Sequence, residues 1–467
     1  MNFGLKALLS RTTGISACVL NIHPSKAVGA KRFVGSRFDN DQTIDYQYFT
    51  NVLSKRRRPS MLRELTHVMS RMPPETISFA VGVPNVNTFP FEEINIKLKD
   101  GKSIVIGGKD LGTALQYLPS RGFTELIGWL RKLQDHMHGE NDWSKTSILI
   151  TAGGQEALCN TIEMCMEEGA SVLVQDPVYP AVADLVRPYR PNYLALPQDK
   201  DGICPDTLQK KLEYCVENNM PLPKMLYVNP TGCNPAGVSL TTERKKLIYE
   251  LACKYNFLIL EDDSYYYLHF LQEDPVSFLS MDTEGRVVRF DSFSKILSSG
   301  LRVGFVTGPE PLLRNIELHL QVSTLHASAL SQMIIYKMFE LVGIEGLLDH
   351  FKTVRDFYKM KKTQMIEAVE RHLQGLAEWN QPSGGMFLWV KINGINNVYN
   401  MALRRCVENN LLVVPGHPFM YLDQENDCSY IRMSYSLATQ EQMEQGCARL
   451  AEMIRAEKAS LKLRSVS

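Results

Sequence analysis

Short apolar runs alternate with longer amphipathic stretches from about residue 147 onward. The amphipathic stretches Gln155–Met166 and Thr242–Tyr255 predict helices. The short runs predict strands at Ser147–Ala152, Ser171–Gln175, Asn192–Leu196, Lys224–Val228, Phe257–Glu261, Val287–Phe290 and Arg302–Thr307. Apolar runs separated by helices are typical of a mostly parallel sheet that is covered by helices on both faces. The chain is therefore predicted to have an α/β fold.

The pattern changes after Pro309, where long helical stretches appear. Helices are predicted at Val354–Leu373 and around Asn400–Asn409. Strands are predicted at Met386–Ile392, Leu411–Val414 and Tyr430–Tyr435. These elements predict a smaller α+β domain at residues 346–467, next to a large domain at 96–345. We expect the N-terminal segment, residues 41–95, to contribute to the small domain and to the substrate site.

The N-terminus has a different composition from the rest of the chain. No Asp or Glu precedes Asp39, whereas Lys and Arg recur among Leu, Ala, Val, Ser and Thr. This composition is typical of a mitochondrial transit peptide, and a disordered basic tail is the alternative. We expect residues 1–40 to be a transit peptide, disordered or cleaved, that directs the chain to the mitochondrial matrix.

Composition and charge exclude several other classes of protein. The 467 residues carry 51 basic and 51 acidic side chains, so no overall field favours nucleic acid or an anionic membrane. No apolar run is long enough for a membrane-spanning helix. The ten cysteines are scattered, without a Cys-x-x-Cys pair, which argues against a zinc site or a disulfide framework and favours reduced thiols. His136 and His138 are interpreted as a surface pair, so no metal is expected.

Polar motifs follow several of the predicted strands, where parallel sheets bind their ligands. Gly153–Gln155 opens a helix, and bare amides there suit an anion, although a simple turn is the alternative. Asn229–Gly237 contains two Asn-Pro-x-Gly turns. Glu261–Asp263 precedes three tyrosines and indicates either a polar site or a helix cap. Asp291–Lys295 combines hydroxyls with a lysine, and an arginine follows at Arg302, so this region could bind a phosphate or supply a nucleophilic amine.

Ser292 and Lys295 also match Ser-x-x-Lys, the acyl-enzyme motif of β-lactamases and penicillin-binding proteins. That chemistry further requires Ser-Asp-Asn and Lys-Thr-Gly elements and an exported chain. The sequence contains neither element, and the N-terminus lacks a long apolar export core. The acyl-enzyme interpretation is therefore disfavoured.

The strand-end motifs, in this order, resemble those of class I/II aminotransferases of fold type I, nearest to the kynurenine/2-aminoadipate branch. The resemblance extends from about Tyr46 to the C-terminus and rests on Asp291–Arg302, on Glu261–Asp263 with its tyrosines and on Gly385–Trp389. It implies pyridoxal 5'-phosphate as cofactor. It also implies a homodimer that moves the amino group of L-kynurenine, L-2-aminoadipate or related amino acids to 2-oxoglutarate or another 2-oxo acid by a ping-pong mechanism.

There are three alternatives, two of which belong to other functional classes. The same cofactor supports β-elimination on cysteine conjugates, and a related transaminase could have broad aromatic specificity. A cofactor-sensing regulator would carry a DNA-binding domain in front of the resemblance, where only the transit-peptide-like segment is found. The regulator is therefore disfavoured.

The resemblance also implies individual roles at the cofactor ring. Lys295 would form the Schiff base and shuttle the proton, while Asp262 would pair with the pyridine nitrogen. Asn234 and Tyr265 would donate to the 3'-oxygen, and Tyr179 would stack on the ring. Asn229 is the alternative to Asn234, which is chosen because Pro235-Ala236-Gly237 leads into the next helix.

Further roles concern the phosphate and the substrate. The implied phosphate ligands are Gly154, Gln155, Ser292, Ser294 and Arg302. The implied substrate contacts are Arg432 on the α-carboxylate, Asn234, Tyr179, Arg63 on the distal group and Tyr117, the last from either subunit. Arg63 and Tyr117 could instead be packing or surface residues. The sequence departs from the branch at Gly154, where a serine is frequent, and at Ser264, where a proline is frequent.

Overall fold

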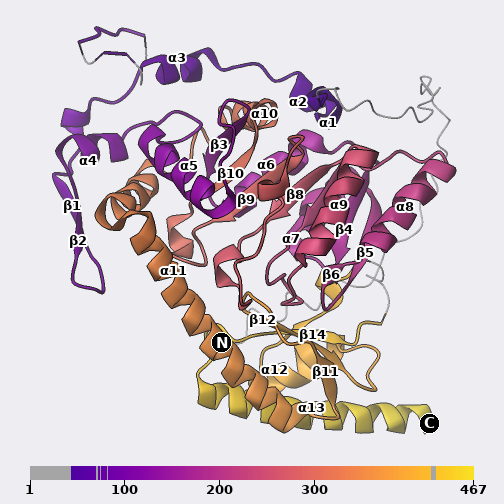
Figure 1. Cartoon of the computed structure of the whole chain (residues 1–467). Helices are drawn as coiled ribbons and strands as arrows, with labels where there is room; N and C mark the ends of the chain where they lie inside the picture. Colours follow the sequence, from indigo (N-terminus) through magenta and orange to yellow (C-terminus); the bar gives the residue numbers. More distant parts are fainter. Residues whose placement is uncertain (1–43, 70–71, 74, 81, 422–426, 467) are drawn as a thin grey trace, which may run out of the picture. The chain divides into compact units, whose positions relative to one another are not determined.

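The structure of the chain is a computed structural model that describes residues 44–69, 72–73, 75–80, 82–421 and 427–466. The described residues belong to one compact unit, Thr43–Ser467. The predicted transit peptide lies outside them. Within this unit the chain forms a large mixed sheet flanked by helices and a smaller antiparallel sheet (Figure 1).

The large sheet has eight strands in the order β3-β10-β9-β8-β7-β4-β5-β6. Their bounds are β3 Thr146–Thr151, β10 Gly304–Pro309, β9 Val287–Ser292, β8 Leu258–Asp262, β7 Met225–Val228, β4 Ser171–Asp176, β5 Asn192–Asp199 and β6 Gly202–Ile203. Strands β9, β8, β7, β4 and β5 pair in parallel, while β10 is antiparallel to both neighbours and β6 is antiparallel to β5. The prediction of a mostly parallel sheet is confirmed.

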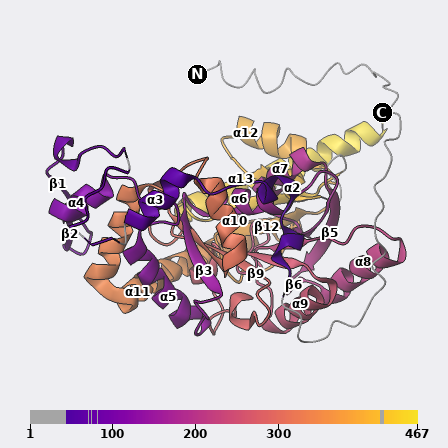
Figure 2. The same ribbon diagram turned by 90° about the horizontal axis from the view of Figure 1, so that it is seen from above.

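Alternation along the strands supplies apolar side chains to both faces of this sheet. Leu258 and Leu260 pack with α6 (Gly154–Cys165), α7 (Pro180–Val186) and α10 (Glu310–Leu320). Ile259, between them, packs with α8 (Pro205–Glu217) and α9 (Thr242–Tyr255), which lie side by side (Figures 1 and 2). Helix α5 (Thr124–His138) packs against Ile148 and Ile150 of β3. Burial on both faces explains why these strands are continuous apolar runs in the sequence.

The small sheet has the order β11-β12-β14-β13, with β11 Ala377–Trp379, β12 Phe387–Ile392, β14 Tyr430–Ser434 and β13 Val414–Pro415. It packs with the second half of α11 (Ala329–Leu373) and with α13 (Gln440–Val466). Helix α11 contains one non-helical residue, Gly343, with φ 65°. The strand predicted at Leu411–Val414 is corrected to Val414–Pro415, since Leu412 is 82% exposed and unpaired with β14. The helix predicted near Asn400 is a π-helical turn, Met401–Arg405, followed by α12 (Cys406–Glu408).

The N-terminal segment forms α1 (Tyr46–Phe49), α2 (Val52–Lys55) and α3 (Met61–Met69). Phe49 is fully buried in the core shared by α6 and α10. The Asn51 side chain donates to the carbonyl of Met166 at 2.8 Å, and Gln321 accepts from the Ser60 amide at 2.8 Å. All of these contacts are made with the large domain, whereas the sequence led us to expect that residues 41–95 contribute to the small domain. Further along, β1 (Glu93–Lys97) and β2 (Ser103–Gly107) form an unpredicted hairpin next to α4 (Gly108–Ala114).

A fully buried guanidinium, that of Arg289 on β9, joins the ends of two strands. It contacts the carboxylates of Glu261 at 3.2 Å, Asp263 at 3.1 Å and Asp291 at 3.0 Å. Burial raises the pKa of Asp291 to about 6 even though Arg289 opposes this shift. Arg289 therefore supplies the guanidinium that contacts all three carboxylates at these strand ends.

Replacing Arg289 with methionine is expected to lower the free energy of unfolding by about 3–5 kcal/mol, because it removes the guanidinium that pairs with three buried carboxylates. Urea unfolding followed by circular dichroism measures this change. Arg404→Met is the control, since Arg404 and Glu408 form an exposed pair whose loss costs about 1 kcal/mol or less. Equal stability losses in the two variants would contradict the role of Arg289.

Candidate active site

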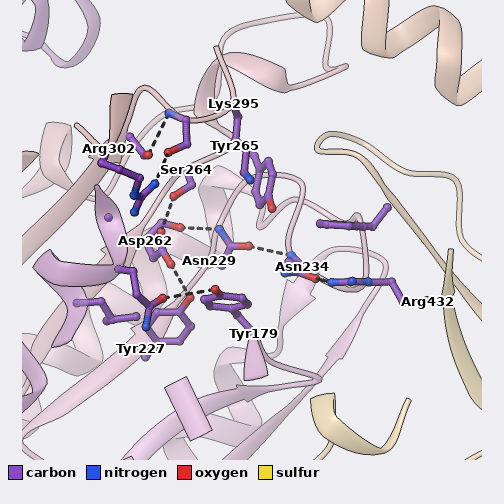
Figure 3. A pocket seen from close by; sticks show the side chains of 16 residues that line it. Tyr179, Tyr227, Asn229, Asn234, Asp262, Ser264, Tyr265, Lys295, Arg302 and Arg432 are labelled. Atoms are coloured by element: carbon purple, nitrogen blue, oxygen red, sulfur yellow. Dashed lines mark hydrogen bonds between the residues drawn. The ribbon is translucent and has the colours of Figure 1, made fainter. Parts of the chain in front are cut away.

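A cavity of about 320 Å³ lies at the carboxyl ends of the parallel strands (Figure 3). It brings together the predicted residues Gly154, Gln155, Tyr179, Asn234, Asp262, Tyr265, Ser292, Ser294, Lys295, Arg302 and Arg432. It is also lined by Leu158, Tyr227, Asn229, Ser264 and Phe387. Because parallel strands end at one edge of the sheet, residues that are far apart in the sequence meet there. Arg432 and Phe387 come from β14 and β12, so the small sheet closes one side.

One corner of the cavity is built for an anion. Helix α6 begins at Gly154, so its first amides face the cavity without helical partners. The Arg302 guanidinium donates to the Ala152 carbonyl at 3.0 Å and to Ser294 Oγ at 3.4 Å. Gly153 has φ 83°, and a side chain there would collide with the Arg302 guanidinium. Hydroxyls, amides and one guanidinium fit a phosphate group.

The carboxylate of Asp262 stands at the end of β8. Tyr227 donates its hydroxyl to Oδ2 at 2.7 Å, and Ser264 donates to Oδ1 at 3.0 Å. Burial raises the pKa of Asp262, while these two hydrogen bonds lower it. A buried carboxylate in this environment gains from a cationic partner, and a protonated pyridine nitrogen fits that requirement.

Lys295 lies in the loop after β9 and lines the same cavity. Burial lowers the pKa of its ammonium, Arg302 lowers it further, and Asp262 opposes the shift. A lower pKa increases the fraction of neutral amine at a given pH, and the neutral amine is the nucleophilic form. Lys295 can therefore attack an aldehyde held between the anion corner and Asp262.

The opposite wall presents a second guanidinium, that of Arg432. Its Nη1 donates to Asn234 Oδ1 at 2.9 Å, and its centre lies 4.2 Å from the ring centroid of Phe387. Its Nε is buried and has no partner among the described residues. A planar guanidinium with a free donor is suited to a carboxylate. Tyr179 lines the cavity as well and donates weakly to Gln155 Oε1 at 3.4 Å.

The two asparagines left as alternatives by the sequence have different surroundings. The Asn234 side chain binds Arg432 at the cavity wall. The Asn229 side chain instead binds backbone, donating to the Asp262 carbonyl at 2.5 Å and accepting from the Asn234 amide at 2.9 Å. The side chain of Asn234 is thus the one that binds the Arg432 guanidinium.

Arg63 and Tyr117 are the two predicted site residues that the structure does not bring into the cavity. Arg63 is 8% exposed, and its guanidinium donates to Ser120 Oγ at 3.1 Å and to the Leu118 carbonyl. Tyr117 is 48% exposed and contacts the His326 ring edge to face. These contacts engage Nε and Nη2 of Arg63 with a serine hydroxyl and a backbone carbonyl.

Sequence reasoning missed Tyr227 and Phe387. Tyr227 lies inside an apolar strand and is 1% exposed. A buried tyrosine hydroxyl almost always requires a hydrogen-bond partner, and that rule was a usable signal. Phe387 begins β12 and carries no comparable signal.

Two features are absent from the described residues. No helix within ranges 44–69, 72–73, 75–80, 82–421 and 427–466 is long and apolar enough to cross a membrane. The same part of the chain contains no group of three or more His, Cys, Asp or Glu side chains that could hold a metal ion.

A nucleophilic lysine, an anion corner, a buried carboxylate and a carboxylate clamp in one cavity define a pyridoxal-phosphate enzyme that acts on amino acids. The family model described as aminotransferase class I and II matches residues 74–450. The chain belongs to this aminotransferase family, and pyridoxal 5'-phosphate is its cofactor. It is a transaminase whose substrates are amino acids and 2-oxo acids.

Individual relatives extend over nearly the whole chain. The chain is 41% identical over 423 residues to the mitochondrial kynurenine/alpha-aminoadipate aminotransferase of Bos taurus, which covers 88% of this chain and 99% of that protein. An aminotransferase structure from Candida albicans gives a TM-score of 0.79 at 25% identity, covering 90% of this chain and 99% of the other. The kynurenine aminotransferase of Pyrococcus horikoshii gives 0.71 at 29% identity, covering 88% and 98%.

Proposed function

We propose that this transaminase moves the amino group of L-kynurenine, L-2-aminoadipate or related amino acids to 2-oxoglutarate or another 2-oxo acid. The main support for this proposal is the cavity that Lys295, Asp262 and Arg432 line together. The name of the Bos taurus relative and the ligands named for the Pyrococcus horikoshii structure support the choice of amino donors. A ping-pong sequence follows because one cavity must accept the amino acid and the oxo acid in turn.

Lys295 holds the cofactor covalently in the proposed mechanism. Pyridoxal phosphate supplies a carbonyl carbon for the amino group and a ring that accepts electrons from Cα. Once released by the substrate amine, Lys295 Nζ would take the proton from the substrate Cα and return it to the carbonyl carbon of the cofactor. Asp262 would keep the ring nitrogen protonated, which would maintain the electron-accepting character of the ring.

Other side chains bind and orient the reactants. Arg432 would bind the α-carboxylate with Asn234 at its side, and Asn234 and Tyr265 would donate to the ring oxygen of the cofactor. Tyr179 would stack on the ring. The phosphate is held by the ligands Gly154, Gln155, Ser292, Ser294 and Arg302. Each of these groups lines the same cavity, which is what one reacting centre requires.

The proposal includes the assembly and the location of the enzyme. We infer a homodimer in which Tyr117, half exposed on its own chain, borders the cavity of the partner subunit. We also infer a mitochondrial matrix location, which the acid-free N-terminus and the name of the mitochondrial relative support. Import of a fusion carrying residues 1–40 tests the location, and sedimentation of the purified chain tests the dimer.

The half-reaction is the direct test of substrate choice. Adding L-kynurenine or L-2-aminoadipate to the holoenzyme, without an oxo acid, is expected to bleach the visible absorbance of the bound cofactor. The amino group is then retained on the enzyme, and 2-oxoglutarate restores the spectrum. If both amino acids leave the spectrum unchanged, the branch assignment is wrong although the family stands. Pyruvate release from a cysteine conjugate without an oxo acid would instead indicate β-elimination.

A further inference from the structure

Two buried side-chain amides, those of Gln175 and Asn229, lie at the carboxyl edge of the sheet, next to the cavity. Gln175, on β4, is 1% exposed, and Asn229, just after β7, is 4% exposed. Gln175 Oε1 accepts from the Asn229 backbone amide at 2.8 Å. Gln175 Nε2 donates to Cys233 Sγ at 2.9 Å. Both ends of the Gln175 amide are therefore engaged.

Asn229 extends this connection in two directions, which Figure 3 shows as dashed lines on either side of its amide. Its Nδ2 donates to the backbone carbonyl of Asp262 at 2.5 Å. Its Oδ1 accepts from the backbone amide of Asn234 at 2.9 Å, and Asn234 Oδ1 accepts from Arg432. The buried side-chain amide of Asn229 thus connects Asp262, the proposed partner of the ring nitrogen, with Asn234, which binds Arg432.

The amides act where backbone pairing stops. The β4–β7 ladder ends with Val174 opposite Tyr227, and the β7–β8 ladder ends with Val228 opposite Glu261. Beyond these pairs the two ladders stop, and backbone groups there need other partners. Gln175 and Asn229 supply those partners from side chains, so they continue the two ladders into the cavity wall.

We propose that Asn229, anchored by Gln175, is a positioning residue that sets Asp262 and Asn234 relative to each other and, through Asn234, orients Arg432. The inference rests on the proposed functions of Asp262, Asn234 and Arg432. Neither amide needs to touch a reacting atom for this role. Loss of the Asn229 amide should therefore lower kcat and weaken carboxylate binding together, because this one amide binds residues on both sides of the cavity.

Asn229→Ala and Gln175→Met test the proposal from the two ends of the connection. Asn229→Ala leaves the Asp262 carbonyl and the Asn234 amide without partners, and kcat is expected to fall roughly 10- to 100-fold. Gln175→Met keeps the side-chain volume, removes both hydrogen bonds and should lower kcat in the same direction by a smaller factor. Gln175→Glu retains the acceptor for the Asn229 amide and should recover part of that loss.

Binding of a carboxylic acid that cannot react gives a second readout. The probe is 3-phenylpropionate, which has a carboxylate for Arg432 and no amino group, and its Kd for the holoenzyme is measured by calorimetry. Asn229→Ala and Gln175→Met should both raise this Kd. A purely structural role would lower the Tm without changing either kcat or this Kd at a temperature well below the Tm.

Gln198→Met is the matched control. Gln198 Nε2 also reaches Cys233 Sγ, at 3.7 Å, and donates to the Pro177 carbonyl at 2.7 Å, but it has no hydrogen bond to Asn229. This variant should lower the Tm and leave kcat and Kd within about twofold of the parent.

The outcomes separate this inference from the proposed function. The inference is overturned if the Gln175 and Asn229 variants behave like Gln198→Met, with kcat and Kd unchanged. Should Asn229→Ala fail to fold, Gln175→Met and Gln175→Glu decide the matter. If the proposed function is wrong, the unsubstituted holoenzyme itself will neither bind 3-phenylpropionate nor change its absorbance with any amino acid.

Discussion

Replacing Lys295 with alanine is expected to abolish multiple turnover and the visible absorbance of the covalently held cofactor. Lys295 lies in the cavity with Asp262 and Arg302, and burial lowers the pKa of its ammonium. The variant loses both the attachment point and the base that takes the Cα proton. A positioned base contributes about 10²- to 10⁴-fold. Because the attachment point is lost as well, kcat should fall by ~10⁴-fold or more. Transfer from L-kynurenine to 2-oxoglutarate, followed by product chromatography, measures this loss.

Lys352→Ala is a suitable control for that experiment. Lys352 is 63% exposed and pairs with Asp356 on the surface of α11, so the same change of side chain leaves the cavity intact. Its kcat and absorbance should equal those of the parent enzyme. Sustained multiple turnover by Lys295→Ala would exclude Lys295 as the attachment point and the base.

The central sheet was predictable because its strands are buried on both faces. A strand without a solvent-facing side reads as an unbroken apolar run, and Ser171–Gln175 and Val287–Phe290 matched β4 and β9 to within two residues. The hairpin of β1 and β2 was missed. Its first strand alternates exposed and half-buried residues, so it contains no such run. Strand β13 was misplaced because pairing with β14, rather than local hydrophobicity, determines it.

The site residues that come directly after strands were predictable from the sequence. Asp262, Ser292 and Lys295 come directly after strands, and a parallel sheet brings such positions to one edge. The supporting hydrogen bonds were not predictable in this way. The bond from Asn229 to Asp262 depends on the register of β7 against β8, which a single sequence does not encode in its composition. The contacts of Arg63 with Leu118 and Ser120 were not predictable for a related reason, since these partners lie 55 and 57 residues further along the chain.

Replacing Asp262 with asparagine is expected to lower kcat by about 10²- to 10⁴-fold, equivalent to roughly 3–5 kcal/mol of activation free energy. The substitution keeps the size of the side chain and a carbonyl oxygen for the Tyr227 hydroxyl, which lies 2.7 Å from Oδ2. It removes the negative charge that keeps the ring nitrogen protonated, and an uncharged nitrogen withdraws electrons from Cα less strongly. Stopped-flow measurement of the half-reaction with L-kynurenine isolates this step from product release.

Tyr227→Phe calibrates the effect of the charge. It leaves the Asp262 carboxylate in place and removes one of its two side-chain hydrogen bonds, since the bond from the Ser264 hydroxyl at 3.0 Å remains. Loss of a hydrogen bond to a charged group costs about 1.5–3 kcal/mol, so its half-reaction should fall between those of the parent and of Asp262→Asn. The loss in both variants should lie mainly in the rate of the step rather than in Kd for the substrate, because Arg432 and Asn234 remain to bind the carboxylate. A half-reaction of near-normal rate in Asp262→Asn would show that the charge of this carboxylate does not assist the chemistry.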